Sequence, residues 1–184
     1  TVFKTTGSDY EWEVTDFTVK NRDNLVIYEL LLRDFTAEKS LKAAMEKLPY
    51  LQSLGVNAIE LMPVQEFDGN LSWGYNPAYF FALDKAYGTD EDYRKFIDEC
   101  HKLGIAVIMD LVHSHAVKNE MEGLGLLDGD PAQYFHGGDR RVHNAWDSLC
   151  FNYGKNEVVH FLLSNCKYWL EEFKFDGFRF DGVT

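Results

Sequence analysis

Four short and nearly continuous apolar runs mark the chain from residue 25 onward. Runs of this kind, bounded by polar residues, are typical of strands that are buried on both faces of a sheet. The predicted strands cover residues 25–35, 56–64, 105–116 and 177–183. The pattern therefore favours a sheet covered on both sides over a sheet with one face in water.

The segments between these runs have helical spacing. Residues 36–55 place apolar side chains three and four positions apart, although Pro49 strains this helix. Residues 89–104 begin on a Thr cap with acidic residues in the first turn, and residues 156–174 form the third predicted helix. Because strands and helices alternate, the pattern predicts right-handed crossovers and a parallel sheet.

Two α/β architectures fit this order, a doubly wound sheet and a (β/α)8 TIM barrel. No Gly-rich phosphate-binding fingerprint follows the first run, and long connections follow the second and third runs, as in barrel enzymes. We therefore expect residues 24–184 to form the first four strands of a barrel, truncated because a complete barrel takes roughly 250 residues. Residues 1–23 are expected to be the tail of a preceding β domain and a linker, a short β-rich lead-in.

Composition narrows the class of ligand. The 184 residues include 30 acidic and 18 basic side chains, a formal net charge of −12. This charge argues against nucleic acid and against an anionic membrane surface as partners, and it favours a neutral, polyhydroxylated or cationic ligand. No apolar run approaches the roughly 18 residues of a membrane span. Three cysteines make a poor disulfide framework and favour buried thiols in a reducing compartment.

Polar residues collect where the last two predicted strands end. Arg179 and Asp181 are two positions apart, so they share a strand face and point towards the barrel axis if Phe178 and Phe180 face the helices. The guanidinium would keep the carboxylate ionised and oriented, as a nucleophile towards an anomeric carbon requires. A buried structural ion pair explains the same spacing equally well.

His113 and His115 also share a face in the predicted third strand. An H-x-H pair at a barrel strand end can ligate zinc, but a His that donates to a nearby carboxylate such as Asp110 is the commoner arrangement. Trp73 and Tyr75 could be core aromatics, yet the polar and Gly residues around them predict a loop. Aromatic rings in a cleft suit stacking on the apolar face of a sugar.

These motifs together resemble glycoside hydrolase family 13, the α-amylase family. GFRFDGVT at the fourth strand resembles the family's fourth-strand motif, DLVHSH its third-strand motif, and WGYNPAYFFALDKAYGT the segment with its ring-stacking Tyr. The resemblance implies that Asp181 is the catalytic nucleophile, with Arg179 beside it. It also implies that Tyr75, Asp110 and His115 line the sugar site where cleavage occurs, and we add Trp73 as a substrate-binding candidate.

The two halves of the chain resemble different subgroups of that family. The second half, from HAVKNEMEG to the end, is similar to glycogen branching enzymes of the eukaryotic type, whereas the first half is closer to bacterial α-amylase-like members. Either the protein is an unusual member, or the sequence joins two genes near FIDECHKLGIAVIMD.

The resemblance implies a retaining enzyme that acts on an α-1,4-glucan such as glycogen or a starch-like polysaccharide, and we expect a 1,4-α-glucan branching enzyme that forms α-1,6 branches. An α-amylase-type hydrolase and a non-catalytic carbohydrate-binding or interaction barrel are the alternatives. The family's acid Glu on the fifth strand and its further Asp on the seventh have no counterpart here, so residues 1–184 alone are expected to be inactive. Ser114 stands where the family often has a calcium-ligating Asn, and we expect no metal or other cofactor. A branching enzyme would be cytoplasmic, and an amylase periplasmic or secreted.

Overall fold

The computed structural model describes residues 10–69 and 71–183. The described elements follow one another in this order: η1 (Arg22–Asn24), β1 (Ile27–Leu30), α1 (Leu32–Phe35), α2 (Leu41–Met45), α3 (Leu48–Ser53), β2 (Ala58–Leu61), β3 (Gln65–Phe67), β4 (Pro77–Leu83), α4 (Asp90–Lys102), β5 (Ala106–Leu111), β6 (His115–Val117), η2 (Gly138–Arg140), β7 (Val142–His143), β8 (Ser148–Cys150), α5 (Asn156–Glu172) and β9 (Gly177–Phe180).

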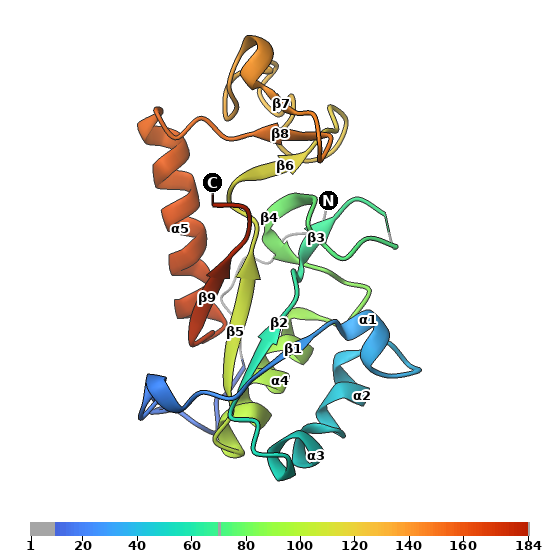
Figure 1. Cartoon of the computed structure of the whole chain (residues 1–184), viewed down its shortest axis with the longest axis vertical. Helices are drawn as coiled ribbons and strands as arrows, with labels where there is room; N and C mark the ends of the chain where they lie inside the picture. Colours follow the sequence, from blue (N-terminus) through green and yellow to red (C-terminus); the bar gives the residue numbers. More distant parts are fainter. Residues whose placement is uncertain (1–9, 70, 184) are drawn as a thin grey trace.

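A four-stranded parallel sheet in the order β1-β2-β5-β9 forms the centre of the fold. In Figure 1 the four strands lie side by side, with α4 behind them and α5 along the β9 side, while no helix lies in front. This confirms the predicted α/β fold with a parallel sheet. Within the described residues, β1 and β9 are the two edges of this sheet.

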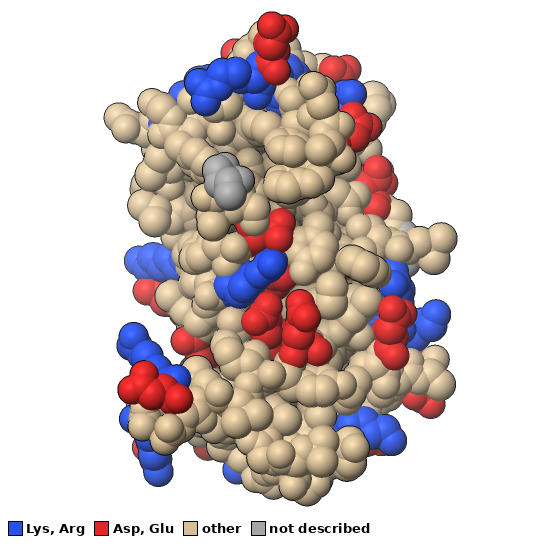
Figure 2. All heavy atoms as spheres, viewed as in Figure 1, with Lys and Arg blue, Asp and Glu red and all other residues tan. Residues whose placement is uncertain are grey.

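The two faces of the parallel sheet differ in chemistry. The helix-covered face is apolar and packs Ile59, Val107 and Met109 into a core that is completed by side chains of α4 and α5. The opposite face carries Glu29, which is paired in register with Glu60 on the neighbouring strand. Figure 2 shows this face, where acidic side chains gather over the middle of the sheet around a basic one. The open face of the parallel sheet therefore carries charged residues, whereas its helix-covered face is apolar.

The predicted strands are shorter in the structure than the apolar runs. β1 ends at Leu30, and Leu32–Phe35 form the helical turn α1, in which Leu32 is buried and Arg33 pairs with Asp34. The prediction of one strand over residues 25–35 is therefore wrong at its C-terminal end. An apolar run gives no period with which to separate a strand from a following buried turn of helix.

The third predicted strand divides into two. β5 ends at Leu111, and His115 begins β6, which belongs to a different, three-stranded sheet. The remaining two strands begin or end inside their predicted ranges, since β2 is Ala58–Leu61 and β9 is Gly177–Phe180.

The single helix predicted over residues 36–55 is instead two short helices, α2 and α3, which meet at Lys47. Pro49 lies in the first turn of α3, where its missing N–H costs no hydrogen bond. The other two predicted helices are confirmed as α4 and α5. Thr89 and Asp92 form a reciprocal capping box at the start of α4.

Two small antiparallel units were missed from the sequence. β3 pairs with β4, and β6, β8 and β7 form the three-stranded sheet that lies beyond the C-terminal ends of the parallel strands in Figure 1. A second apolar core, which includes Phe80, Phe135 and Phe151, joins this sheet to β4 and α5. The excursion after β5 is therefore a packed unit above the sheet.

The lead-in differs from the prediction where it is described. Residues 10–23 contain no strand, and residues 1–9 lie outside the described residues. The carboxylate of Asp98 on α4 accepts hydrogen bonds from the Tyr10 hydroxyl and from the backbone N–H groups of Glu13 and Val14. This part of the lead-in is therefore docked on α4 and is not a free linker. In the part of the chain that the structure describes, every helix is too short or too polar to cross a membrane.

Candidate active site

The candidate site forms at the C-terminal ends of β5 and β9. Asp110 lies directly opposite Arg179 in the register of these two parallel strands. Asp181 follows the end of β9, and its backbone N–H donates to the carbonyl of Leu111 at 2.9 Å. This bond continues the strand pairing by one step, so Arg179 and Asp181 remain on the same face.

Arg179 holds both carboxylates through one nitrogen. Its Nη1 lies 2.9 Å from each oxygen of Asp110 and 2.9 Å from Oδ1 of Asp181. Asp110 is fully buried, whereas the Asp181 side chain is 22% exposed. The hydrogen bond to Asp110 raises the pKa of the Arg179 guanidinium, which therefore stays charged. Of the two carboxylates, Asp181 is the one that a ligand can reach.

Tyr75 completes the cluster from the loop between β3 and β4. Its hydroxyl donates to Oδ2 of Asp110 at 2.9 Å, and its ring lies 5.9 Å from the Arg179 guanidinium carbon. Burial, followed by the hydrogen bond to Asp110, raises the pKa of the Tyr75 hydroxyl, so it remains a donor at neutral pH. Burial also raises the pKa of the Asp110 carboxyl, and the bonds from Arg179 and Tyr75 oppose this shift.

His115 connects this loop to the start of β6. Its Nε2 lies 2.7 Å from the carbonyl of Tyr75, which can only accept, so Nε2 carries the proton. Nδ1 therefore accepts from the Ser114 hydroxyl at 2.8 Å. Burial lowers the pKa of His115, which keeps this neutral tautomer at physiological pH. Ser114 thus orients His115.

His113 does not join the site. It is buried away from the open face, and its Nε2 lies 2.8 Å from the side-chain oxygen of Asn165 on α5. The predicted pairing of His113 and His115 on one strand face is wrong, because the chain leaves the sheet after Leu111. The commoner alternative, a hydrogen bond to Asp110, is also wrong, since the partners are Asn165 and the Tyr75 carbonyl. Among the described residues, no three His, Cys, Asp or Glu side chains are placed to hold a metal ion.

The structure thus brings five of the six predicted site residues into one hydrogen-bonded cluster. These are Tyr75, Asp110, His115, Arg179 and Asp181. Trp73 lies in the same loop as Tyr75 but is 60% exposed and outside this cluster. Its role as a substrate-binding residue stays a prediction.

Trp146 is a residue of the site region that was not predicted. It lies in the loop between β7 and β8, is 50% exposed, and its ring centroid lies 5.3 Å from that of His115. The same signal that indicated Trp73, an aromatic residue among polar loop residues, is present in the sequence HNAWDSL. That signal gives no indication of which strand ends such a loop will approach.

Comparison with known proteins gives a consistent picture. Residues 17–124 match the sequence profile of the family described as alpha amylase, catalytic domain. A 1,4-alpha-glucan-branching enzyme of Aspergillus oryzae is 46% identical over 169 residues, which is 90% of this chain and 24% of that protein. A chloroplastic/amyloplastic 1,4-alpha-glucan-branching enzyme of Arabidopsis thaliana is 53% identical over 137 residues, which is 74% of this chain and 17% of that protein. The chain therefore spans only about a fifth of the length of these relatives.

Solved structures agree on the fold. A protein assigned as an alpha amylase from Salmonella typhimurium superposes with a TM-score of 0.85 at 35% identity, over 95% of this chain and 29% of that one. A maltogenic alpha-amylase of Thermotoga neapolitana superposes with a TM-score of 0.77 at 28% identity, over 89% of this chain and 41% of that one. The Aspergillus alignment is long enough to cross the predicted junction near residues 96–110, which favours a single gene.

Proposed function

Because this chain belongs to the α-amylase family, in its catalytic domain, we propose that it forms part of a 1,4-α-glucan branching enzyme. The four parallel strands are then the first four of a (β/α)8 barrel over residues 24–184. Residues 1–23 connect the barrel to a preceding β domain, and the part from residue 10 onward docks on α4. The substrate is an α-1,4-glucan, and neither nucleic acid nor a membrane is a partner, in keeping with the net charge of −12.

The observation that carries the proposal is the orientation of Asp181 by Arg179 at 2.9 Å, on an open polar face. In the proposed reaction, an oxygen of Asp181 attacks the anomeric carbon and forms a covalent glycosyl-enzyme, while the bond to the leaving glucan oxygen breaks. A second carboxylic acid supplies the proton that the leaving oxygen takes. The 6-hydroxyl of another glucan chain then gives its proton to the second carboxylate and attacks the same carbon, which breaks the bond to Asp181 and creates the α-1,6 branch.

The remaining residues bind and orient the sugar. Tyr75 presents its ring beside the carboxylates, and the ion pair with Asp110 keeps Arg179 in place. His115 offers a neutral imidazole that is already fixed by Ser114, and Trp73 offers an exposed ring at the rim. No step requires a metal ion or another cofactor. The expected location is the cytoplasm, where glycogen is made.

Hydrolysis is the second candidate, because the chain is 35% identical to a bacterial protein assigned as an amylase. In that case water takes the place of the 6-hydroxyl, and the expected location becomes the periplasm or the exterior of the cell. The two reactions share the step at Asp181 and differ only in the acceptor.

The test uses the complete product of the gene with amylose as substrate. Linkage analysis should detect new α-1,6 bonds in excess of new reducing ends. Asp181→Asn should lower turnover by more than about 1,000-fold, because an amide cannot form the glycosyl-enzyme. Asp16→Asn, at an exposed Asp of the lead-in, is the matched control and should keep full activity. Reducing ends without new branches would establish the hydrolase, and full activity of Asp181→Asn would refute the mechanism.

A further inference from the structure

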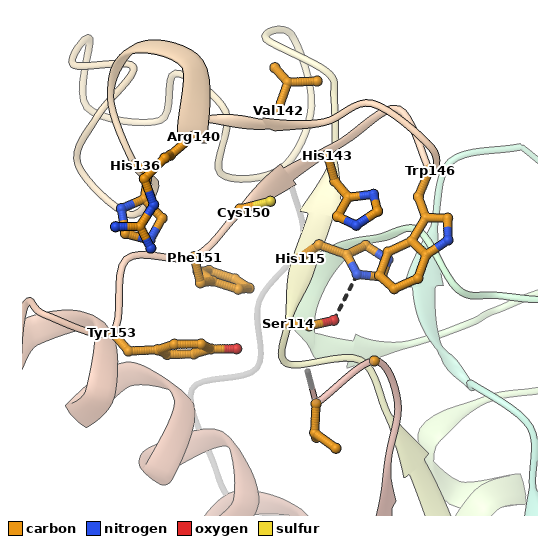
Figure 3. Close-up of a pocket in the computed structure, with 12 residues that line it drawn as sticks. Ser114, His115, His136, Arg140, Val142, His143, Trp146, Cys150, Phe151 and Tyr153 are labelled. Atoms are coloured by element: carbon orange, nitrogen blue, oxygen red, sulfur yellow. Dashed lines mark hydrogen bonds between the residues drawn. The ribbon is translucent and has the colours of Figure 1, made fainter.

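A cavity of about 760 Å³ lies between the end of β9 and the three-stranded sheet β6-β8-β7. Its wall includes His115, His143, Trp146 and the turn at Gly182. In Figure 3, His115, His143 and Trp146 lie together on one side of the space, and His136 and Tyr153 lie on the other. A volume of this size is in the range of known small-molecule sites. Because His115 and Gly182 line it, the cavity borders the candidate site, although the Asp181 side chain itself is not part of its wall.

Trp146 is held flat against His143 in the wall of this cavity. The two ring centroids are 4.0 Å apart and the planes differ by 15°. The backbone N–H of Trp146 also donates to the carbonyl of His143 at 3.2 Å, which closes the turn between them. His143 covers one face of the indole, yet the side chain remains 50% exposed. His115 also packs near the indole, with ring centroids 5.3 Å apart, and atoms Cη2 and Cζ3 lie against Gly182, so the exposed part of the ring is what these three contacts leave free.

Gly182 brings Trp146 close to the nucleophile. A Cβ atom at Gly182 would lie 3.3 Å from ring atoms Cη2 and Cζ3 of Trp146 and 2.9 Å from Oγ of Ser114. The residue has φ +58°, a conformation that glycine adopts readily. The indole therefore packs against the residue that follows Asp181 in the chain.

The charges of the cavity fit a neutral ligand. No carboxylate side chain is among the residues that line it, although the chain as a whole has a net charge of −12. Burial lowers the pKa of His115 and of His136, so these imidazoles are neutral at physiological pH. Both ring nitrogens of His115 are already hydrogen-bonded, so the lining offers an aromatic surface, the imidazoles of His136 and His143, and the single guanidinium of Arg140. These groups suit a sugar, which has an apolar ring face and hydroxyls at its edge.

We propose that Trp146, supported by His143, stacks on the glucosyl unit next to the one that Asp181 attacks. The cavity under β6-β8-β7 then binds the glucan beyond the cleavage site and selects chains long enough to reach the indole. This inference rests on the proposed function for the identity of the glucan, and it adds a binding surface that the cluster around Arg179 lacks.

The test measures binding in the complete gene product with an Asp181→Asn background, so that no turnover occurs. Calorimetric titration with maltoheptaose should give a Kd that rises at least about 10-fold on Trp146→Ala. Trp146→Phe, which keeps a flat ring, should retain most of the affinity, whereas Trp146→Leu should not. Tyr50→Ala is the matched control, because Tyr50 is a 61% exposed aromatic residue on α3 at the opposite end of the parallel sheet.

The outcomes separate this proposal from the proposed function. A Kd within twofold of the parent in Trp146→Ala, or equal affinities of the Phe and Leu variants, would overturn the stacking surface. If Trp146→Ala does not fold, the comparison of Phe with Leu still decides. Loss of maltoheptaose binding in Trp146→Ala of a protein that forms no α-1,6 bonds would keep the binding surface and reject the branching reaction. Normal branching by the complete gene product, together with a maltoheptaose Kd that Trp146→Ala leaves unchanged, would keep the branching reaction and reject the binding surface.

Discussion

At the scale of single residues, Arg179 is the side chain on which the candidate site depends. One nitrogen serves both Asp110, which is fully buried, and Asp181, which is partly exposed. Removal of the guanidinium would leave Asp110 with only the Tyr75 hydroxyl as a side-chain partner. A buried carboxylate without its cation is costly, and a nucleophile without its neighbour loses its orientation.

We therefore expect Arg179→Ala to lower glucan turnover by at least about 100-fold, which is the usual effect of removing one preorganised electrostatic partner. The free energy of unfolding should fall by about 1–3 kcal/mol, because the buried Asp110 loses a hydrogen bond to a charged donor. Initial rates on amylose and chemical denaturation check both parts. Arg22→Ala, at an exposed Arg in η1, should change neither, and a matching loss in that control would contradict the assignment.

At the scale of elements, the end of β5 is fixed by a buried polar network on α5. The side-chain oxygen of Asn165 accepts from Nε2 of His113 at 2.8 Å and from the indole N–H of Trp169 at 3.1 Å. Gln65 of β3 donates to the same oxygen and to the carbonyl of Phe80 on β4. The network ties β3, β4 and α5 to His113, which follows β5 and lies two residues before His115 at the start of β6.

This network should make stability sensitive to mild acid. Burial lowers the pKa of His113 below its ordinary value of 6.5, so folding disfavours the protonated imidazole. The stabilisation is complete above pH 6.5 and is lost as the pH falls below that value, because the unfolded chain then binds more protons. We expect the Tm of the complete gene product to fall between pH 7.5 and 5.5.

His113→Gln should weaken this pH dependence, and the lowered pKa of His115 accounts for part of what remains. Calorimetry across that pH range measures the effect. His160→Gln, at an exposed His of α5, is the control and should leave the wild-type slope intact. An identical slope in wild type and His113→Gln would show that the network does not titrate.

At the scale of the whole molecule, the parallel sheet has one covered and one open face (Figure 1). Its edge strands expose Ile27 at 49% and Phe180 at 43%. Glu29 and Glu60 lie together on the open face, and burial, with the charges of Asp110 and Glu29, raises the pKa of Glu60. Open strand edges and a half-buried carboxylate are features that further structure would normally cover.

A polypeptide of residues 1–184 alone is therefore expected to self-associate through the edges of β1 and β9. We also expect it to leave amylose unchanged, since it holds the proposed nucleophile without the family's acid Glu. Light scattering and an amylose assay on the purified polypeptide test these expectations. A monomer that melts cooperatively would contradict the first, and robust turnover would contradict the second.

The sequence by itself determined the parallel α/β fold and the membership of the family. It also predicted that Arg179 and Asp181 share a face and that Asp110 lies near them, because alternation along a strand and the order of motifs are local properties of the chain, while their catalytic and binding roles stay predictions. The tertiary structure decided the features that depend on contacts between residues far apart in the sequence. In the structure His113 is hydrogen-bonded to Asn165, whereas His115 is hydrogen-bonded to the Tyr75 carbonyl, so the two imidazoles lie in different environments. It also brought Trp146 over Gly182, since the path of a loop depends on the surfaces against which it packs.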